Sequence, residues 1–394
     1  MSTQKVTDAV IETVSSSKLT GTLPALDGSA LTGISGFVDT TSANDPATNT
    51  NPVTGVGTVW VNSTSGEIFI CTDATADANI WTNIGAGTGD VAPYIFAGTA
   101  SGYTVKGRHS TTNQTKIDKW SFASATANAA SPASLSQGAY SAGAYASATH
   151  GYSAGGLIPN YYDGIEKFSF ANEGTNSVTP ATLIGGRNYM SNHNNKDYGF
   201  NGGGEGYTSG TSGPVIKWST VNKFAFASET NEEEHCSLTG STESNSTGVT
   251  SATDGYVTAY TNSSSTVDDI WKFSQSSGSQ AQIVSQLTQI RGYMAGSGSE
   301  THGFYHGGNH GSYIDTIDSF LFSNESTTAD HGNLTEARGY MAGVSFTTHG
   351  YTAGGDVGGR SNRIDRFPYN NPNANASDVG DLTDVRNHVC GTQY

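Results

Sequence analysis

Apolar and polar positions alternate in short segments along most of this chain, and polar or glycine-rich turns separate the segments. In 338–346 the side chains of Tyr340, Ala342 and Val344 fall on one face, and three further segments of this kind follow before residue 383. A period of two is the pattern of β-strands, so this stretch predicts four consecutive short strands.

The four-strand pattern recurs through the chain, and three markers follow it. An aromatic pair at i and i+2 returns every 47 to 56 residues: Trp120/Phe122, Phe168/Phe170, Phe224/Phe226, Trp271/Phe273, Phe320/Phe322 and Phe367/Tyr369. An aromatic residue precedes a small-residue turn at Tyr94, Tyr152, Phe200, Tyr256, Phe304 and Tyr351. The third marker is a leucine that recurs once in each copy, at Leu135, Leu183, Leu238, Leu287, Leu334 and Leu382. Three markers in one register predict six copies of an all-β repeat.

The two ends of the repeat region complement each other. The first copy begins at Tyr94 with a second strand, and the chain ends in a first strand at Arg386–Tyr394. We expect these strands to pair, because pairing completes one copy and leaves no exposed sheet edge. Four strands in about 50 residues is the spacing of kelch propellers. The sequence thus predicts a closed six-bladed β-propeller over 91–394.

The order of features within a copy also resembles kelch repeats. A strand led by arginine is followed by an aromatic with Gly-Gly, as in Tyr351 and Gly354-Gly355, and then by an aromatic-rich third strand. The resemblance implies a kelch-like propeller. The copper site of galactose oxidase, which shares the kelch fold, has no recognisable counterpart here.

Residues 1–36 differ from the rest. Apolar residues at 6, 9, 10 and 14 predict one stripe on a short helix. The following SKLTGTLPALDGSALTGI, with Pro24 and several glycines, favours extended chain. This phrase resembles shaft and attachment segments of bacteriophage tail fibres. The resemblance implies a virion protein, usually trimeric, that attaches to other virion proteins through 1–36.

Residues 37–90 predict a linker followed by a small β domain. The stretch 37–55 is rich in Thr, Asn, Ser, Pro and Gly, which is typical of a linker. TVWVN at 58–62 and EIFICT at 67–72 flank STSG and predict a β-hairpin, with Trp60 and Trp81 as its apolar anchors. The hairpin also resembles modules of phage fibre proteins. GAGTGD at 85–90 marks the boundary to the repeats.

Composition and charge limit the possible functions. The net charge of −16 disfavours binding to phosphate backbones, so we expect no nucleic-acid partner. No run of about 20 apolar residues predicts a membrane span, and the first residues do not form a signal peptide. The three cysteines show neither a disulfide framework nor zinc spacing, and Cys390 falls at a small, buried position of the repeat.

Two polar columns accompany the repeat. Carboxylates precede the aromatic pairs at Asp118, Glu166, Asp269, Asp318 and Asp365, with Asn222 in the third copy. Arginines lead the first strands at Arg187, Arg291, Arg338 and Arg386. Because a buried carboxylate without a partner is costly, we expect the columns to pair. We read the third copy as lacking both the acid and the arginine, as expected if the two columns pair. We assign both columns a structural role rather than a catalytic one.

Histidines could bind a metal ion, and serines could act as catalytic nucleophiles. His150, His302 and His349 share one repeat position and are read as parts of a turn, whereas His306 and His310 are additional. A glycine-rich turn fixes no ligand geometry, so we predict no metal site and no cofactor. No G-x-S-x-G or comparable context surrounds a serine, and no catalytic residue is assigned.

Aromatic residues in loops are the candidates for ligand binding. They lie between the second and third strands, including the longest insertion, Glu205–Ser219: Tyr161, Tyr162, Asp163, Tyr207, Trp218 and Tyr313. Exposed aromatics beside polar groups suit sugar rings, and loops commonly carry function. Alternatively, these residues pack against the hairpin domain or a neighbouring chain.

These observations favour a non-enzymatic structural protein of a phage virion, a tail fibre or similar appendage. It would be exposed on the particle, and its propeller would display loops to a host surface glycan or protein. We expect a homo-oligomer, with a trimer favoured, and no membrane insertion. One alternative is a decoration or adaptor that binds only virion proteins. Another is a hydrolase of surface polysaccharide.

The aromatic pairs give a first prediction. If Phe320 fills the space between neighbouring copies, Phe320→Ala lowers the free energy of unfolding by about 3–5 kcal/mol. Urea denaturation of both proteins measures this difference. A loss below about 1 kcal/mol would place the ring at the surface.

Overall fold

The computed structural model describes residues 38–84, 96–124, 126–172, 177–238, 244–258, 268–325 and 328–394. The chain divides into two compact units, Met1–Pro93 and Tyr94–Tyr394. Within the described residues every regular element is a strand, so the all-β class is confirmed. The predicted N-terminal helix, the fibre-like phrase, the 85–90 boundary and Tyr94 lie outside the described residues.

The first unit contains one four-stranded sheet. Its order is β1 (Thr40–Ser42), β2 (Val59–Asn62), β3 (Ile68–Asp73) and β4 (Ile80–Asn83). The predicted hairpin is confirmed, since β2 and β3 pair antiparallel. Trp81 is fully buried, and its ring lies 5.9 Å from that of Trp60. The prediction that 37–55 is only a linker is wrong, because β1 pairs with β2 in parallel and thereby belongs to the sheet.

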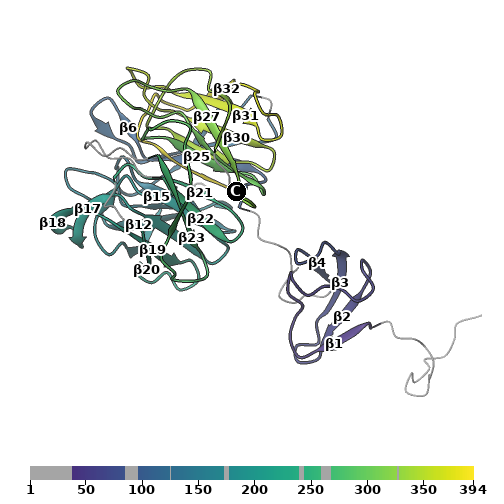
Figure 1. Ribbon diagram of the computed structural model, residues 1–394. Coiled ribbons are helices and arrows are strands. Elements are labelled where there is room, and N and C mark those ends of the chain that lie inside the picture. The colour runs from purple at the N-terminus through teal and green to yellow at the C-terminus, as the bar shows by residue number, and fades with distance from the viewer. Residues whose placement is uncertain are drawn as a thin grey trace, which may run out of the picture. The chain divides into compact units, whose positions relative to one another are not determined.

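The second unit contains six four-stranded antiparallel sheets of one topology (Figure 1). Sheet 1 consists of β33 (Cys390–Gln393), β5 (Ser101–Val105), β8 (Lys116–Ser121) and β9 (Ala130–Ser134); sheet 2 of β10 (Gly143–Ala146), β11 (His150–Ala154), β12 (Gly164–Ser169) and β13 (Val178–Thr182); sheet 3 of β15 (Ser191–Asn194), β16 (Tyr198–Gly202), β19 (Thr220–Ala225) and β20 (Glu233–Ser237). Sheet 4 consists of β21 (Thr247–Thr250), β22 (Asp254–Thr258), β23 (Asp269–Ser274) and β24 (Gln282–Gln286); sheet 5 of β25 (Ala295–Gly298), β26 (His302–His306), β27 (Thr316–Leu321) and β28 (Ala329–Asn333); sheet 6 of β29 (Ala342–Ser345), β30 (His349–Ala353), β31 (Arg363–Pro368) and β32 (Ser377–Asp381).

Five further strands lie in the connections. β6 (Arg108–His109) and β7 (Thr112–Asn113) form a two-stranded sheet. β14 (Arg187–Asn188), β17 (Glu205–Ser209) and β18 (Ser212–Lys217) form a three-stranded one. The insertion expected as a loop at Glu205–Ser219 is therefore mainly a hairpin, in which Tyr207 pairs with Val215.

The first strand of each sheet, called the inner strand here, contacts the inner strands of two other sheets. β10 lies against β33 and β15, β21 against β15 and β25, and β29 against β25 and β33. Small residues permit this approach: a Cβ on Gly343 would meet the carbonyl oxygen of Gly296 at 2.1 Å. The inner strands thus follow one another in a complete circuit.

Sheet 1 joins the two ends of the second unit. β33 pairs antiparallel with β5, from Cys390 opposite Val105 to Gln393 opposite Gly102. The pairing of the last residues with an early second strand is confirmed, but that strand is Ser101–Val105 and does not begin at Tyr94. Tyr103 occupies the position of Tyr152 in sheet 2, since both lie opposite a lysine of the third strand.

The aromatic marker on the third strand is buried between sheets, as predicted for Phe320, which is 2% exposed. The residue opposite it is Gly303, whose added Cβ would lie 2.4 Å from the Phe320 ring. In sheet 4 the residue opposite the corresponding Gly255 is Phe273, not Trp271. Placing Trp271 in the aromatic column is therefore wrong by two residues, because the i and i+2 pair hides which ring holds the position.

Buried ion pairs connect the two polar columns. Arg386 donates to Asp118 at 2.7 Å, and the pairs Arg291–Asp318 and Arg338–Asp365 have distances of 3.1 and 3.0 Å. All these side chains are fully buried. In these three clusters the threonine after the marker leucine donates to the carboxylate of the following sheet. Thr383, for example, donates its amide and hydroxyl to Asp118. Each cluster therefore fastens two sheets together.

Three sheets depart from the predicted columns. In sheet 2, Glu166 pairs with Lys106 at 2.9 Å. In sheet 3, Arg187 pairs with Glu232, which also accepts from Asn222, so the expectation that this copy lacks an ion pair is wrong. In sheet 4, Trp271 fills the carboxylate position, and Asp269 instead accepts from exposed Gln286.

The ion pair in sheet 1 gives a second prediction. Arg386→Met leaves Asp118 buried without its cation and lowers the free energy of unfolding by about 3–5 kcal/mol. The double variant Arg386→Met/Asp118→Leu replaces both charges by apolar groups and should lose less. Urea denaturation compares the two. A double variant less stable than the single one would mean that the pair itself supplies the stability.

Candidate functional site

One end of the second unit gathers the connections that sequence analysis singled out. In an antiparallel meander the turns between strands 1 and 2 and between strands 3 and 4 lie at one end. The connections from strand 2 to strand 3 and the segments entering the inner strands lie at the other. The loop aromatics and the segments that enter the inner strands therefore lie at the same end of the six sheets.

Six equivalent residues mark the entry to the inner strands, each two positions before the strand begins. Their φ angles are all positive, between 53° and 61°: Ser141, Tyr189, Asn245, Tyr293, Tyr340 and His388. Such angles are uncommon for tyrosine and persist only where the surroundings hold them. Backbone bonds supply that hold, since His388 N donates to Tyr340 O and Ser141 N donates to His388 O. Tyr340 was expected on a strand face with Ala342 and Val344; the left-handed turn removes it from that face.

Four aromatic rings from these positions, Tyr189, Tyr293, Tyr340 and His388, form a rosette. The ring centroids of Tyr340 lie 4.2 Å from those of both Tyr293 and His388. Tyr189 lies 5.8 Å from Tyr293 and 5.9 Å from His388, so each ring has two neighbours. All four are half-buried. The rosette therefore presents ring faces and polar tips together at one end of the inner strands.

His388 is held as a neutral ring. Its Nδ1 and the Ser141 hydroxyl lie 2.7 Å apart and share a hydrogen bond. Burial lowers the pKa of His388 to about 4, with nearby Arg108 acting in the same direction and Asp356 against it. Burial likewise raises the pKa of Tyr189 to about 12. At neutral pH these two rosette residues therefore carry no charge.

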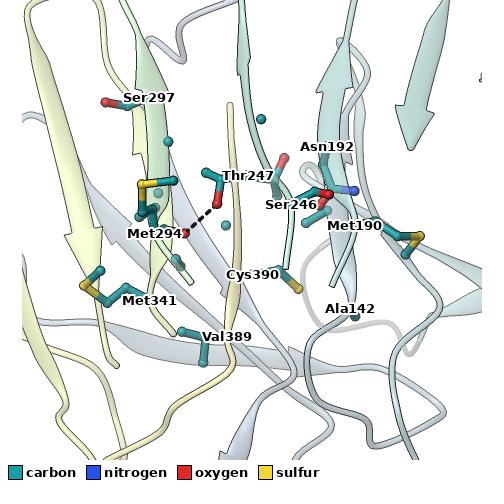
Figure 2. Close-up of a pocket in the computed structure, with 18 of the residues that line it drawn as sticks. Ala142, Met190, Asn192, Ser246, Thr247, Met294, Ser297, Met341, Val389 and Cys390 are labelled. Atoms are coloured by element: carbon teal, nitrogen blue, oxygen red, sulfur yellow. Dashed lines mark hydrogen bonds between the residues drawn. The ribbon is translucent and has the colours of Figure 1, made fainter. Parts of the chain in front are cut away.

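A cavity of about 140 Å³ extends from the rosette along the inner strands. Figure 2 shows part of its lining. Behind the rosette its wall contains the residues that directly precede each inner strand: Ala142, Met190, Ser246, Met294, Met341 and Val389. Further along, Asn192, Gly248 and Gly343 line it with polar side chain and backbone. At the far end lie Asn194, Ser345 and Gln393, and Gln393 donates to the carbonyl of Phe96.

A hydrogen-bonded group stands beside the rosette and links sheets 5, 6 and 1. The hydroxyl of Tyr313 donates to Asp356 at 2.8 Å, and the Asn387 amide donates to the other carboxylate oxygen at 2.7 Å. Although partial burial opposes it, these bonds hold the pKa of Asp356 below its usual range. Arg360 donates to Asn387 and to the carbonyl of Ser110. Tyr313 thus belongs to a fixed polar group.

A second group contains two of the predicted ligand-binding aromatics. The Tyr161 hydroxyl donates to Glu205 at 2.9 Å, and the Tyr161 and Tyr207 rings meet edge to face at 5.2 Å. Partial burial, together with Glu205, raises the pKa of Tyr161. Tyr161 and Tyr207 belong to loops that are separate in the sequence, and the structure brings them together.

The remaining predicted ligand residues have other surroundings. Tyr162 lies beneath Lys106, whose ammonium is 5.0 Å from the ring centre, and Asp163 is half-buried at the end of the same loop. Trp218 is 8% exposed and stacks on buried Arg187 at 4.7 Å. The premise that Trp218 is exposed is wrong, because the hairpin insertion turns it toward the ion pair of sheet 3.

The histidines mainly serve the fold. His150, His302 and His349 each share a hydrogen bond of 2.8 Å with the threonine that precedes them. Buried His306 contacts Ser297 and Thr352, and burial lowers its pKa to about 3. No group of three or more metal-ligating side chains occurs in the described parts of the chain.

The rosette does not follow from the predicted strand pattern. Its signal was present in the repeated segments RNYM, RGYMA, RGYMA and RNHVC, in which an aromatic follows the arginine by two positions. Strand alternation assigned that aromatic to the core. A left-handed residue at the strand entry cannot be read from alternation, because glycine or asparagine is the usual sign of such a turn.

His388 gives a third prediction. Its ring should titrate near pH 4 in the folded protein and near 6.5 in urea. The unfolded chain then binds this proton first, so stability falls as pH drops from about 6.5 toward 4, by up to about 1.4 kcal/mol per pH unit. NMR of the ring protons measures both midpoints. A folded-state midpoint near 6.5 would mean that water reaches the ring freely.

Two findings bear on the class of protein. Among the described residues no helix is long and apolar enough to cross a membrane. No protein-family model and no curated protein matches the chain.

Proposed function

We propose that Tyr94–Tyr394 is a six-bladed, kelch-like β-propeller of a bacteriophage virion protein, and that its rosette end recognises a glycan or protein on the host surface. Three observations support the propeller. The six sheets share one strand order, the inner strands follow one another in a circuit, and β33 completes sheet 1. The kelch assignment rests on the order of the repeat features in the sequence.

The composition of the rosette end is the observation that carries the binding role. Four aromatic rings lie together there, and the Tyr313–Asp356 and Tyr161–Glu205 groups accompany them. Aromatic faces pack on the apolar faces of sugar rings, while amides, hydroxyls and carboxylates bond sugar hydroxyls. Tyrosine also supplies a large contact area at a small cost in conformational entropy. This mixture suits a polar, uncharged surface polymer.

The assignment to a virion depends on the N-terminal phrases at 19–33, which resemble phage fibre segments. In this proposal residues 1–36 attach the protein to other virion proteins, and a trimer is the favoured oligomer. The net charge of −16 supports a partner other than nucleic acid. The propeller would then be exposed on the particle.

One observation favours the alternative of a purely structural decoration or adaptor. Several loop aromatics already have partners within the chain, since Tyr161 packs on Tyr207 and Trp218 is buried on Arg187. Aromatics used in this way shape the loops without needing a host ligand. The proposed binding role therefore depends mainly on the rosette end as a whole.

A binding experiment separates the two roles. The purified full chain is applied to an array of bacterial surface glycans and to envelope preparations of candidate hosts. We expect binding that Tyr161→Ala weakens about tenfold, equivalent to about 1.4 kcal/mol. The matched control, Tyr198→Ala, removes a half-buried tyrosine at the opposite end of sheet 3 and should leave binding unchanged. Absence of binding to every host material would support the structural alternative.

A further inference from the structure

The cavity behind the rosette has an unusual chemical composition. Its described lining includes three methionines, several glycines, and asparagine, serine and threonine side chains, but no lysine, arginine, aspartate or glutamate. His388 is the lining histidine, and it is neutral at pH 7. A charged ligand would therefore lose hydration without gaining a counter-charge. An uncharged ligand meets no such penalty.

Polar atoms are nevertheless available inside. Ser246 is 8% exposed, and its hydroxyl has no hydrogen-bond partner within the described part of the protein. Asn192 projects into the same part of the cavity and donates its amide to Asn201, while Thr247 donates to the carbonyl of Met294 (Figure 2). A buried hydroxyl without a partner is costly, and a ligand hydroxyl placed there would satisfy it.

The two ends of the cavity differ in accessibility. At the far end Asn194, Ser345 and Gln393 are all buried, and Gln393 is bonded to the Phe96 carbonyl. At the rosette end the four rings are half-buried and reach the surface. Side chains at a surface change rotamer in picoseconds to nanoseconds, so displacement of one ring can admit a ligand. A ligand would therefore enter past the rosette.

We propose that this cavity binds a single uncharged sugar residue at the end of a glycan chain. The sugar stacks on the rosette tyrosines and directs hydroxyls toward Ser246 and Asn192. This inference rests on the proposed function and names the ligand class and the position within the rosette end.

The size and the walls of the cavity fit this ligand. The volume of about 140 Å³ is roughly ten times the minimum needed for one water molecule, which matches a ligand of about a dozen heavy atoms. Met190, Met294 and Met341 form part of the lining, and their side chains pack into the hydrophobic clusters between the sheets. The fixed backbone of the inner strands, approached closely because Gly248, Gly296 and Gly343 lack side chains, provides the polar wall.

The test uses the full chain and defined probes. Methyl glycosides of glucose, galactose, mannose and N-acetylglucosamine are compared with glucuronate and sialic acid by saturation-transfer NMR and calorimetry. At least one uncharged glycoside should bind, with dissociation constants near millimolar for a single sugar, and more tightly than either acid. Preferred binding of an acidic sugar, or binding of no probe, would overturn the inference.

Variants locate the site. Ser246→Phe fills the cavity and should weaken sugar binding at least tenfold, whereas Ser277→Phe adds the same ring at an exposed turn between β23 and β24 and should not. Circular dichroism checks that both variants fold. If Ser246→Phe does not fold, Tyr340→Ala provides the second test: it removes a rosette ring and should weaken binding, with Tyr198→Ala as its control.

These results distinguish the inference from the proposed function. If the protein binds host glycans and Ser246→Phe or Tyr340→Ala has no effect on binding, the proposed sugar site in the cavity is wrong. The proposed recognition of the host surface is then retained. If neither host material nor any sugar binds, both are wrong.

Discussion

The antiparallel pairing of β33 with β5 is the constraint on which the rest of the second unit depends. Without the last strand, sheet 1 would have three strands and the inner strands of sheets 2 and 6 would lack a common neighbour. The same segment brings Arg386 to Asp118 and His388 to the rosette. One pairing between distant parts of the chain thus supplies an ion pair, an inner strand and one ring of the rosette.

Packing between inner strands also explains the chemistry of the site. Because backbones approach closely, each strand is entered through a left-handed turn whose carbonyl or amide bonds to a neighbouring turn. The residues at these turns line the cavity, and they are tyrosine, histidine, serine and asparagine. The charged residues of the repeat are used in the Arg–Asp–Thr clusters between sheets, which leaves the cavity lining uncharged.

Much of this fold could be predicted from sequence because its signals are periodic. The recurrence of aromatic, leucine and arginine positions gave the sheets, and the unmatched final strand predicted its own partner. The predicted carboxylate positions were wrong where another residue takes the same place. Trp271 occupies the carboxylate position in sheet 4, and in sheet 3 Glu232 supplies the carboxylate that Asn222 lacks. Lys106, in a left-handed turn normally taken by glycine, supplies a cation from the preceding sheet, which spacing alone does not reveal.

The site was less predictable than the fold. Tyr161 and Tyr313 were found because they interrupt the repeat, whereas Tyr340 obeys the repeat and was assigned to the core. Whether an aromatic faces a cavity or a neighbouring sheet depends on one backbone angle, and sequence alternation does not report that angle.

Hydrogen–deuterium exchange of the backbone amides in β33 tests the central claim most directly. If the last strand completes sheet 1, the ladder amides of Cys390–Gln393 exchange as slowly as those of the inner strand β29 in sheet 6. Exchange within seconds, as in a frayed chain end, would contradict the pairing with β5 and with it the circuit of inner strands.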